Sequence, residues 1–445
     1  MKGRYRAYSV CKESGEKWIG KVPEHWDVQR LGQFFEERRE KVSDKDYPPL
    51  SVTMNGIVPQ LETAAKTDAG DNRKLVLKND FVINSRSDRK GSSGVSTLDG
   101  SVSLISIVMK PREIRPSYVH HLLRSYPFQE EFYRFGKGIV ADLWSTNASE
   151  MRNIKLPIPS QHEQEQIANF LDHETAKIDT LIDKQQQLIK LLKEKRQAVI
   201  SHAVTKGLNP DAVMKDSGVE WLGEVPEHWV PVRIKQISNF ITSGPRGWSD
   251  FISDDGEDAF LQSGDLNNEL EILPHKAKKV MAPKGAEGVR TKLIEGDVVV
   301  CITGANTGRV AVVQNLIATT YINQHLSLIR PIKNKANSAF IGYALTSQGG
   351  RSYFDVMQYG LKEGLSLSNV AEAPLALPSL SEQKVIVETL GNKLFVFTKI
   401  IGHAENQIAL LQERRTALIS AAVTGKIDVR NWQPAQAEIP MEASA

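Results

Sequence analysis

The chain has 445 residues, and a prior of about 150 residues per domain suggests roughly two to four domains. Hydrophobic residues make up 40% and charged residues 24%, which is ordinary for a globular protein and excludes a disordered chain, a collagen-like fibre and a disulfide scaffold. The net charge of +3 excludes little, but no stretch holds the ~18 uninterrupted apolar residues of a membrane helix, and the polar N-terminus indicates no secretory signal.

The first recognisable segment occurs twice. Residues 14–34 read SGEKWIGKVPEHWDVQRLGQF and residues 217–237 read SGVEWLGEVPEHWVPVRIKQI, with 11 identities in 21 positions at a constant offset of 203. Such a repeat indicates a duplicated architecture. The shared Pro-Glu-His-Trp suggests a catalytic role for His25 and His228, but aromatic-rich turns at the start of a domain usually pack. We therefore expect four tryptophans to seat the following segments on a scaffold: Trp18, Trp26, Trp221 and Trp229.

The segments that follow differ in sequence, yet both predict mixed α/β modules. Apolar, β-branched runs predict strands at residues 75–77, 81–83 and 102–108, and at 298–302, 310–313 and 326–329. Short helices are expected at 118–125 and 340–347. Both modules are basic: residues 66–140 carry a net charge of +5 and residues 273–363 a net charge of +7. This charge distribution is typical of a protein that binds a polyanion, although ordinary solvated surface explains charge alone equally well.

In each module a predicted strand leads into a loop rich in Gly, polar and basic residues, at 86–94 and at 303–309. Arg contacts guanine with two hydrogen bonds, Asn contacts adenine, and Ser or Thr contacts either base. A plain hairpin loop remains the simpler interpretation for any single residue. As a matched pair, the loops are candidates for reading DNA bases through Arg86, Arg89, Lys90, Ser92, Thr303, Asn306, Thr307 and Arg309.

A second repeat, at an offset of 219, predicts two long helices at residues 159–207 and 378–427. Ser160 and Ser379 are expected N-caps, each followed three residues later by a glutamate. Apolar residues then recur with 3-4 spacing, at Leu171, Ile178, Leu181, Leu188, Leu192 and Val199 in the first helix, and at Leu390, Phe397, Ile400, Leu411 and Leu418 in the second. This heptad pattern predicts that the helices pair as a coiled coil, with two independent amphipathic helices as the alternative.

Several kinds of catalytic site have no matching motif. The chain has no G-x-x-x-x-G-K-[ST] phosphate loop, no G-x-G-x-x-G, no H-E-x-x-H and no Asn/Asp-Pro-Pro-aromatic run of amino-methyltransferases. Its only cysteines, Cys11 and Cys301, offer no zinc-site spacing and fit a reducing cytoplasm. We therefore expect a cytoplasmic protein with no catalytic residue, cofactor or metal of its own.

The repeated S-G-x-x-W-[IL]-G-x-V-P-E-H-W, the P-S-x-x-E-Q starts of the long helices and their R-x-A-[VL]-I-S-x-A-V-T ends resemble the specificity subunit of type I restriction–modification systems. The resemblance spans about residues 8–427. It implies an α+β fold in which two target recognition domains are joined by two long helices that pair as an antiparallel coiled coil. The implied domains are 1–158, the first helix 159–207, 208–377, the second helix 378–427, and a disordered tail 428–445.

The same resemblance implies a non-catalytic subunit that reads a split, asymmetric target in double-stranded DNA. Its expected partners are two modification (methyltransferase) subunits and two restriction (translocase and nuclease) subunits, with no membrane involved. S-adenosylmethionine would be bound by the modification subunits, and ATP and Mg²⁺ by the restriction subunits. The alternative is a coiled-coil scaffold whose paired modules bind proteins rather than DNA.

Overall fold

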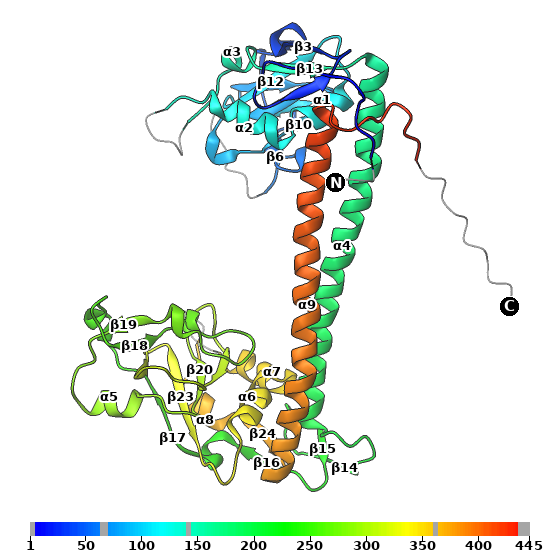
Figure 1. Cartoon of the computed structure of the whole chain (residues 1–445). Coiled ribbons are helices and arrows are strands. Elements are labelled where there is room, and N and C mark those ends of the chain that lie inside the picture. Colours follow the sequence, from blue (N-terminus) through cyan, green and yellow to red (C-terminus); the bar gives the residue numbers. More distant parts are fainter. Residues whose placement is uncertain (1–4, 63–69, 139–143, 359–363, 435–445) are drawn as a thin grey trace, which may run out of the picture. The chain divides into compact units, whose positions relative to one another are not determined.

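The structure is a computed structural model that describes residues 5–62, 70–138, 144–358 and 364–434 (Figure 1). It divides into two compact units. The first consists of Met1–Gln186 with Asn406–Ala445, and the second is Gln187–Glu405. Each of the two long helices therefore contributes one end to each unit.

The first unit combines antiparallel sheets with short helices. Its largest sheet has the strand order β10-β9-β12-β4, and smaller sheets have the orders β11-β8-β5, β6-β7, β1-β2 and β13-β3. The strands are β1 (Cys11–Glu13), β2 (Lys21–Pro23), β3 (Asp27–Arg30), β4 (Phe35–Glu37), β5 (Lys41–Val42), β6 (Leu50–Thr53), β7 (Gly56–Pro59), β8 (Arg73–Val76), β9 (Phe81–Asn84), β10 (Ser93–Val95), β11 (Gly100–Val102), β12 (Ser106–Pro111) and β13 (Lys155–Ile158). The short helices are α1 (Pro116–Leu122), α2 (Tyr126–Arg134) and α3 (Ala148–Met151).

The second unit repeats this plan. Its sheets have the orders β17-β23-β20-β21, β19-β18-β22, β14-β15 and β16-β24. The strands are β14 (Met214–Asp216), β15 (Glu224–Pro226), β16 (Val230–Arg233), β17 (Ser238–Ser243), β18 (Asp258–Leu261), β19 (Lys278–Val280), β20 (Val298–Cys301), β21 (Val310–Val312), β22 (Thr320–Ile322), β23 (Leu326–Pro331) and β24 (Pro374–Leu377). The short helices are α5 (Ala286–Thr291), α6 (Ser338–Thr346), α7 (Gln348–Met357) and α8 (Leu367–Glu372).

The two large sheets are topologically equivalent, because the order β4-β12-β9-β10 matches β17-β23-β20-β21. The small sheets differ: β18 pairs with β22 in parallel, whereas β8 pairs antiparallel with both of its neighbours. The strands and short helices expected from the sequence are confirmed, with one correction. Residues 102–108 are divided between β11 and β12 rather than forming one strand, because the Ser106 amide turns back to the carbonyl of Ser103.

The long helices are α4 (Gln161–Thr205) and α9 (Leu380–Val423). The hydroxyls of Ser160 and Ser379 accept the amides of Glu163 and Glu382 at 3.3 Å in each case, as an N-cap does. After each helix a glycine takes a left-handed conformation that suits this residue type, with φ of 75° at Gly207 and 72° at Gly425.

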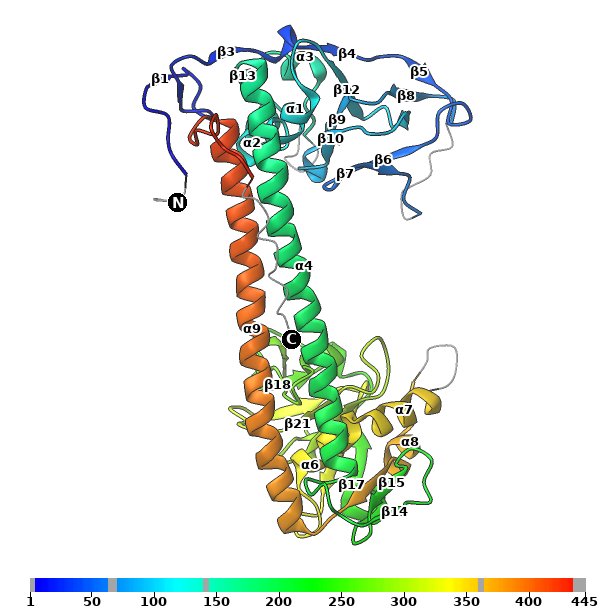
Figure 2. The ribbon, with the colours of Figure 1, turned by 90° about the vertical axis from the view of Figure 1, so that its right-hand side faces the viewer.

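The two long helices pack against each other within each unit, and they are antiparallel because each unit combines the start of one with the end of the other (Figures 1 and 2). In the first unit the shared core includes Leu171, Ile178, Leu418 and Ala422, and in the second it includes Ile200, Val204, Ile386 and Leu390. The predicted coiled-coil pairing is thereby confirmed. Three predicted seam residues are nevertheless at least 40% exposed: Leu181, Leu188 and Ile400. None of the three belongs to a core cluster of the described residues, so the seam stays partly open at these positions.

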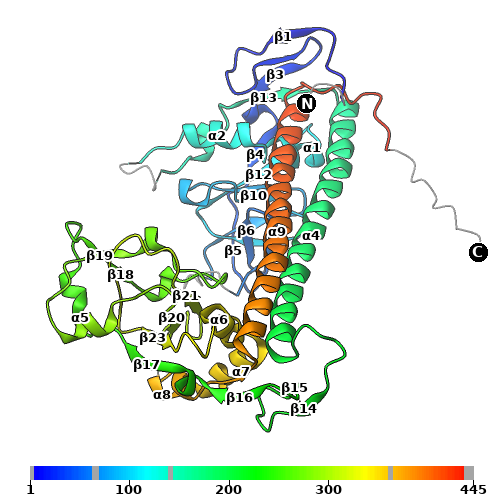
Figure 3. The same cartoon turned by 60° about the horizontal axis from the view of Figure 1, so that its bottom comes forward.

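Near the ends of the long helices, residues of the modules pack against them. In the second unit Phe340 and Ile341 of α6 belong to the same core as Ile386 and Leu390 of α9, and α6 lies beside α9 in Figures 1 and 3. Trp26 and Trp229 are fully buried in the cores of their units, which agrees with the seating role expected for them.

The segment after α9 differs from the expected disordered tail. Asp428 donates its amide to the carbonyl of Arg6 at 2.8 Å, Val429 is 1% exposed, and Trp432 packs edge-on against Phe170. The expectation of disorder is therefore wrong for residues 428–432, because these residues pair with the N-terminal segment and pack on α4. Residues 435–445 lie outside the described part of the chain.

Candidate nucleic-acid interface

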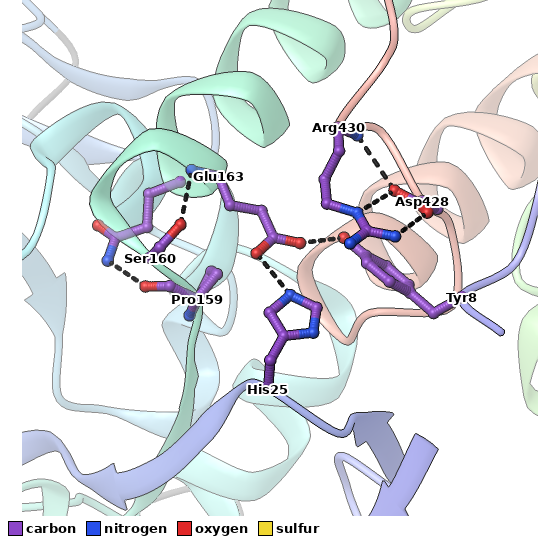
Figure 4. Close-up of polar contacts among 8 residues, drawn as sticks. Tyr8, His25, Pro159, Ser160, Glu163, Asp428 and Arg430 are labelled. Carbon is purple, nitrogen blue, oxygen red and sulfur yellow. Dashed lines mark hydrogen bonds and ion pairs between the residues drawn. The ribbon is translucent and has the colours of Figure 1, made fainter. Parts of the chain in front are cut away.

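The start of α4 in the first unit is held by a buried carboxylate, that of Glu163 (Figure 4). Tyr8 donates its hydroxyl to this carboxylate, and His25 Nε2 lies 3.0 Å from its second oxygen. Burial, followed by the hydrogen bond to Glu163, raises the pKa of Tyr8 far above its usual value. The expected capping box is thus only half formed: Glu163 donates its amide to Ser160, but its carboxylate joins the N-terminal segment to the helix.

The second unit repeats this junction with different donors. Glu382 lies 3.0 Å from His228 Nε2 and accepts the indole N–H of Trp229 at 3.1 Å. His25 and His228 therefore both contact a carboxylate at a helix start. The Pro-Glu-His-Trp repeat attaches each module to its helix, as the sequence predicts.

A buried ion pair sets the strand that precedes each candidate loop. Asp80, just before β9, accepts a hydrogen bond from Arg38 Nε at 2.7 Å, and Asp297, just before β20, accepts one from Arg330 Nη2 at 2.7 Å. Both aspartates are at most 2% exposed, and each also accepts an amide three residues back along the chain, at 2.9 Å. These carboxylates therefore fix the turns from which β9 and β20 run toward the loops.

In the first unit the loop of residues 86–94 begins with a single 3-10 turn, η2 (Ser87–Arg89), and returns as β10. Arg86 and Arg89 are exposed, and Arg89 has a carboxylate neighbour 3.7 Å away in Asp88. Lys90 is also exposed and forms an ion pair with Glu130 of α2. Ser92, in contrast, is only 7% exposed, so of the four candidates it offers the least surface to a ligand.

In the second unit the loop of residues 303–309 joins β20 to β21. Thr303 Oγ1 lies 2.5 Å from His325 Nδ1, and Thr307 donates its hydroxyl to the carbonyl of Gly304 at 2.6 Å. Asn306 and Arg309 donate to the backbone carbonyls of Ser263 and Leu266 at 3.0 and 2.9 Å. The bonds from Asn306 and Arg309 hold the loop against the preceding segment, and all four candidate side chains remain partly exposed.

The structure places four of the eight candidates in each unit, in the loops that join equivalent pairs of strands, β9 to β10 and β20 to β21. Arg309 also lines a neighbouring hollow of about 620 Å³ in the second unit, together with Lys193, Arg196 and Arg351, and the sequence did not predict this hollow. Lys193 and Arg196 belong to α4 and Arg351 belongs to α7. No spacing rule brings these elements together, and the only signal in the sequence was the basic charge of the module.

Three other features concern the thiol of Cys301, metal-ligating side chains and membrane-spanning helices. Cys301 is fully buried in β20, and burial raises the pKa of its thiol to about 11. Across the described ranges, no group of three or more His, Cys, Asp or Glu side chains is placed to hold a metal ion. Within the same ranges, no helix combines the length and the apolar character needed to cross a membrane.

Comparison with known proteins agrees with this duplicated plan. The family model for the type I restriction modification DNA specificity domain matches twice, at residues 23–191 and 226–409. Two proteins of Methanocaldococcus jannaschii are similar over nearly their whole length. One is the putative type I restriction enzyme MjaX specificity subunit, 22% identical over 93% of this chain and 96% of that protein. The other is the type I restriction enzyme MjaVIII specificity subunit, 21% identical over 92% and 95%.

A solved structure of a type I restriction–modification system, described in terms of complex assembly and conformational transition, contains a chain with the same fold. The TM-score is 0.69 at 16% identity, with 91% of this chain and 99% of that chain covered. The two family matches correspond to the two modules and their helices in order. This chain therefore belongs to the type I restriction modification DNA specificity family, as a non-catalytic specificity subunit with two target recognition domains.

Proposed function

We propose that this chain reads an asymmetric, bipartite target in double-stranded DNA, one half-site through each unit. The observation that carries the proposal is the pair of equivalent strands, β9 and β20, that lead into loops of unlike sequence. Equivalent sheets would present the loops in the same way, while different side chains in them would select different bases. The first half-site would be read by Arg86, Arg89, Lys90 and Ser92, and the second by Thr303, Asn306, Thr307 and Arg309.

The paired long helices would set the unspecified spacer between the half-sites, as in proteins that read two sites with two modules. Both modules carry excess positive charge, +5 over residues 66–140 and +7 over residues 273–363. This supports phosphate contacts, which supply a salt-dependent share of the affinity.

The partners proposed are two modification subunits and two restriction subunits. The related proteins are named as subunits of type I restriction enzymes, which supports an assembly of this kind. Exposed apolar side chains on α9 offer a docking surface: Val385, Phe395, Val396 and Ile400. In that assembly the modification subunits would bind S-adenosylmethionine and the restriction subunits would bind ATP and Mg²⁺, in the cytoplasm.

The test is a methylome. The chain would be expressed with the methyltransferase encoded beside it, in a host without other adenine methylation, and methylated positions would be sequenced. A split motif with two unlike halves and a fixed gap is expected, and replacing residues 35–155 by the same region of a relative should change one half only. Methylation without this chain, or without a split motif, would contradict the proposal.

Charge reversal separates this proposal from the alternative of a protein-binding scaffold. Arg86→Glu, Arg89→Glu and Arg309→Glu should abolish DNA binding if the loops read DNA, because each replaces a guanidinium by a carboxylate that phosphates repel. Unchanged DNA binding in all three variants would favour the scaffold.

A further inference from the structure

The hollow of about 620 Å³ lies wholly within the second unit, between α4, α9 and the loop of residues 303–309. Four cationic side chains line it: Lys193, Arg196, Arg309 and Arg351. Glu269 and Glu405 also lie on its wall. Among the described residues, none of the four cationic groups has a carboxylate oxygen within 4.0 Å, so their charge is not neutralised by direct ion pairs.

The repeat explains why Arg196 has no acidic partner. At the offset of 219, Arg196 corresponds to Arg415, and Thr398 corresponds to Asp179. In the first unit Arg415 Nε donates to Asp179 Oδ1 at 2.9 Å. In the second unit the equivalent residue is Thr398, which has no carboxylate and lines the hollow.

A second substitution between the repeats leaves the space open. Gln164 accepts the amide of Arg115 at 2.9 Å, and Gln383 accepts the amide of Asn337 at 2.8 Å, which sets α1 and α6 in equivalent positions. In this register Arg124 corresponds to Thr346.

Arg124 extends across the first unit and donates to the carbonyl of Met54 at 2.7 Å. Thr346 is shorter and lies on the wall of the hollow. The second unit therefore has a shorter side chain, Thr346, where the first has Arg124, and no carboxylate where the first has Asp179.

We propose that this hollow binds one phosphate of the DNA backbone beside the half-site that the loop of residues 303–309 reads. The proposal rests on the DNA-reading function above. Guanidinium groups present paired N–H donors that match phosphate oxygens. Asn306 and Thr307 also line the hollow. A phosphate held here would therefore belong to the same stretch of DNA as the bases that the loop contacts. Such a contact fixes the register of the protein on the duplex without reading sequence.

The test uses the chain assembled with its methyltransferase subunits, and duplexes that contain or lack the methylated target. Arg196→Ala removes a guanidinium, and Thr398→Asp restores the carboxylate that pairs with the equivalent arginine in the first unit. Each variant should bind both duplexes about tenfold or more weakly, because a charged hydrogen bond is lost. The slope of the logarithm of the binding constant against the logarithm of salt concentration should fall in magnitude by about one. The methylated motif should not change.

Two matched controls separate a local contact from general charge. Gln187→Glu adds the same charge to an exposed position of α4 outside the hollow, and Arg415→Ala removes the equivalent arginine of the first unit. Both should bind within about twofold of the unsubstituted protein. If Gln187→Glu weakens binding as much as Thr398→Asp, the lining supplies only diffuse attraction and the proposal is wrong.

Phosphates of the target are then replaced one at a time by uncharged methylphosphonate. At one position near the second half-site the replacement should weaken binding by the unsubstituted chain but have little further effect on Arg196→Ala or Thr398→Asp. The absence of any such coupled position would overturn the phosphate site even where sequence-specific binding is intact. If the unsubstituted complex shows no preference for its target, the DNA-reading function itself fails, and the phosphate site falls with it.

Discussion

His120 gives the first unit a defined response to acid. Its ring Nε2 lies 2.6 Å from Arg124 Nη1, so the neutral ring accepts a hydrogen bond from the guanidinium. Burial, followed by the positive charges of Arg124 and of His121, lowers the pKa of His120 to about 3. Protonation would replace the accepting lone pair by an N–H that faces another donor, so the folded state resists the proton.

The sign of the effect follows from where the proton binds. The unfolded chain takes up the proton at the ordinary histidine pKa of about 6.5, whereas the folded chain does so only near 3. Above about pH 6.5 both states are neutral at this ring and stability does not depend on it. Stability then falls as the pH falls from about 6.5 to 3, by about 1.4 kcal/mol per pH unit, which is about 2 kcal/mol at pH 5.

Hydrogen exchange of α1 peptides, corrected for the intrinsic pH effect, measures the opening free energy of this region. His120→Gln keeps an acceptor for Arg124 but does not titrate. The loss between pH 7 and pH 5 should therefore be about 2 kcal/mol smaller in this variant than in the unsubstituted chain. His162→Gln, at an exposed position on α4, should retain the full pH response. Equal pH dependence in His120→Gln and the unsubstituted chain would refute the reasoning.

Two further predictions concern buried groups. Asp80→Asn and Asp297→Asn should each destabilise their own unit by about 2–3 kcal/mol, because each leaves a guanidinium without its carboxylate. Urea titration of each variant measures these losses. Glu36→Gln, which breaks the exposed pair with Arg112, should cost less than about 1 kcal/mol in the same titration, and equal losses would contradict the burial argument. Iodoacetamide at pH 8 should alkylate exposed Cys11 and spare buried Cys301 until urea is added, as peptide masses will reveal; labelling of both in the folded chain would be inconsistent with the raised pKa.

The features that the sequence predicts well depend on local pattern. The 3-4 spacing, the serine caps and the terminal glycines of α4 and α9 are all local signals, and both helices form over nearly the expected residues. The strands leading into the loops are recognisable for the same reason, since β9 and β20 are continuous apolar runs. Pairing of the helices could be inferred because the heptad pattern occurs twice in one chain.

Features that depend on distant residues could not be predicted in this way. Glu163 looks like the second half of a capping box, but its carboxylate contacts Tyr8 and His25, which lie more than a hundred residues away. Val429 and Trp432 look like part of a polar tail until the N-terminal segment and α4 are present to cover them. The exposed seam positions Leu181 and Leu188 likewise fit the pattern, and only the packed structure shows which side of the seam is left open.

Burial distinguishes the junction at Glu163 from an ion pair that forms in the first unit alone. Glu163 is 3% exposed, and removing one partner of a buried charge costs several kcal/mol, whereas the side chain of its counterpart Glu382 is 31% exposed. The Arg415–Asp179 pair is different, because its side chains are 38% and 49% exposed. A pair at such exposure contributes about 0–1 kcal/mol, so the second unit loses little stability with threonine at position 398. The same change leaves Arg196 without an acid beside the loop of residues 303–309, and this is why the duplicated scaffold can differ in anion binding at almost no cost to its fold.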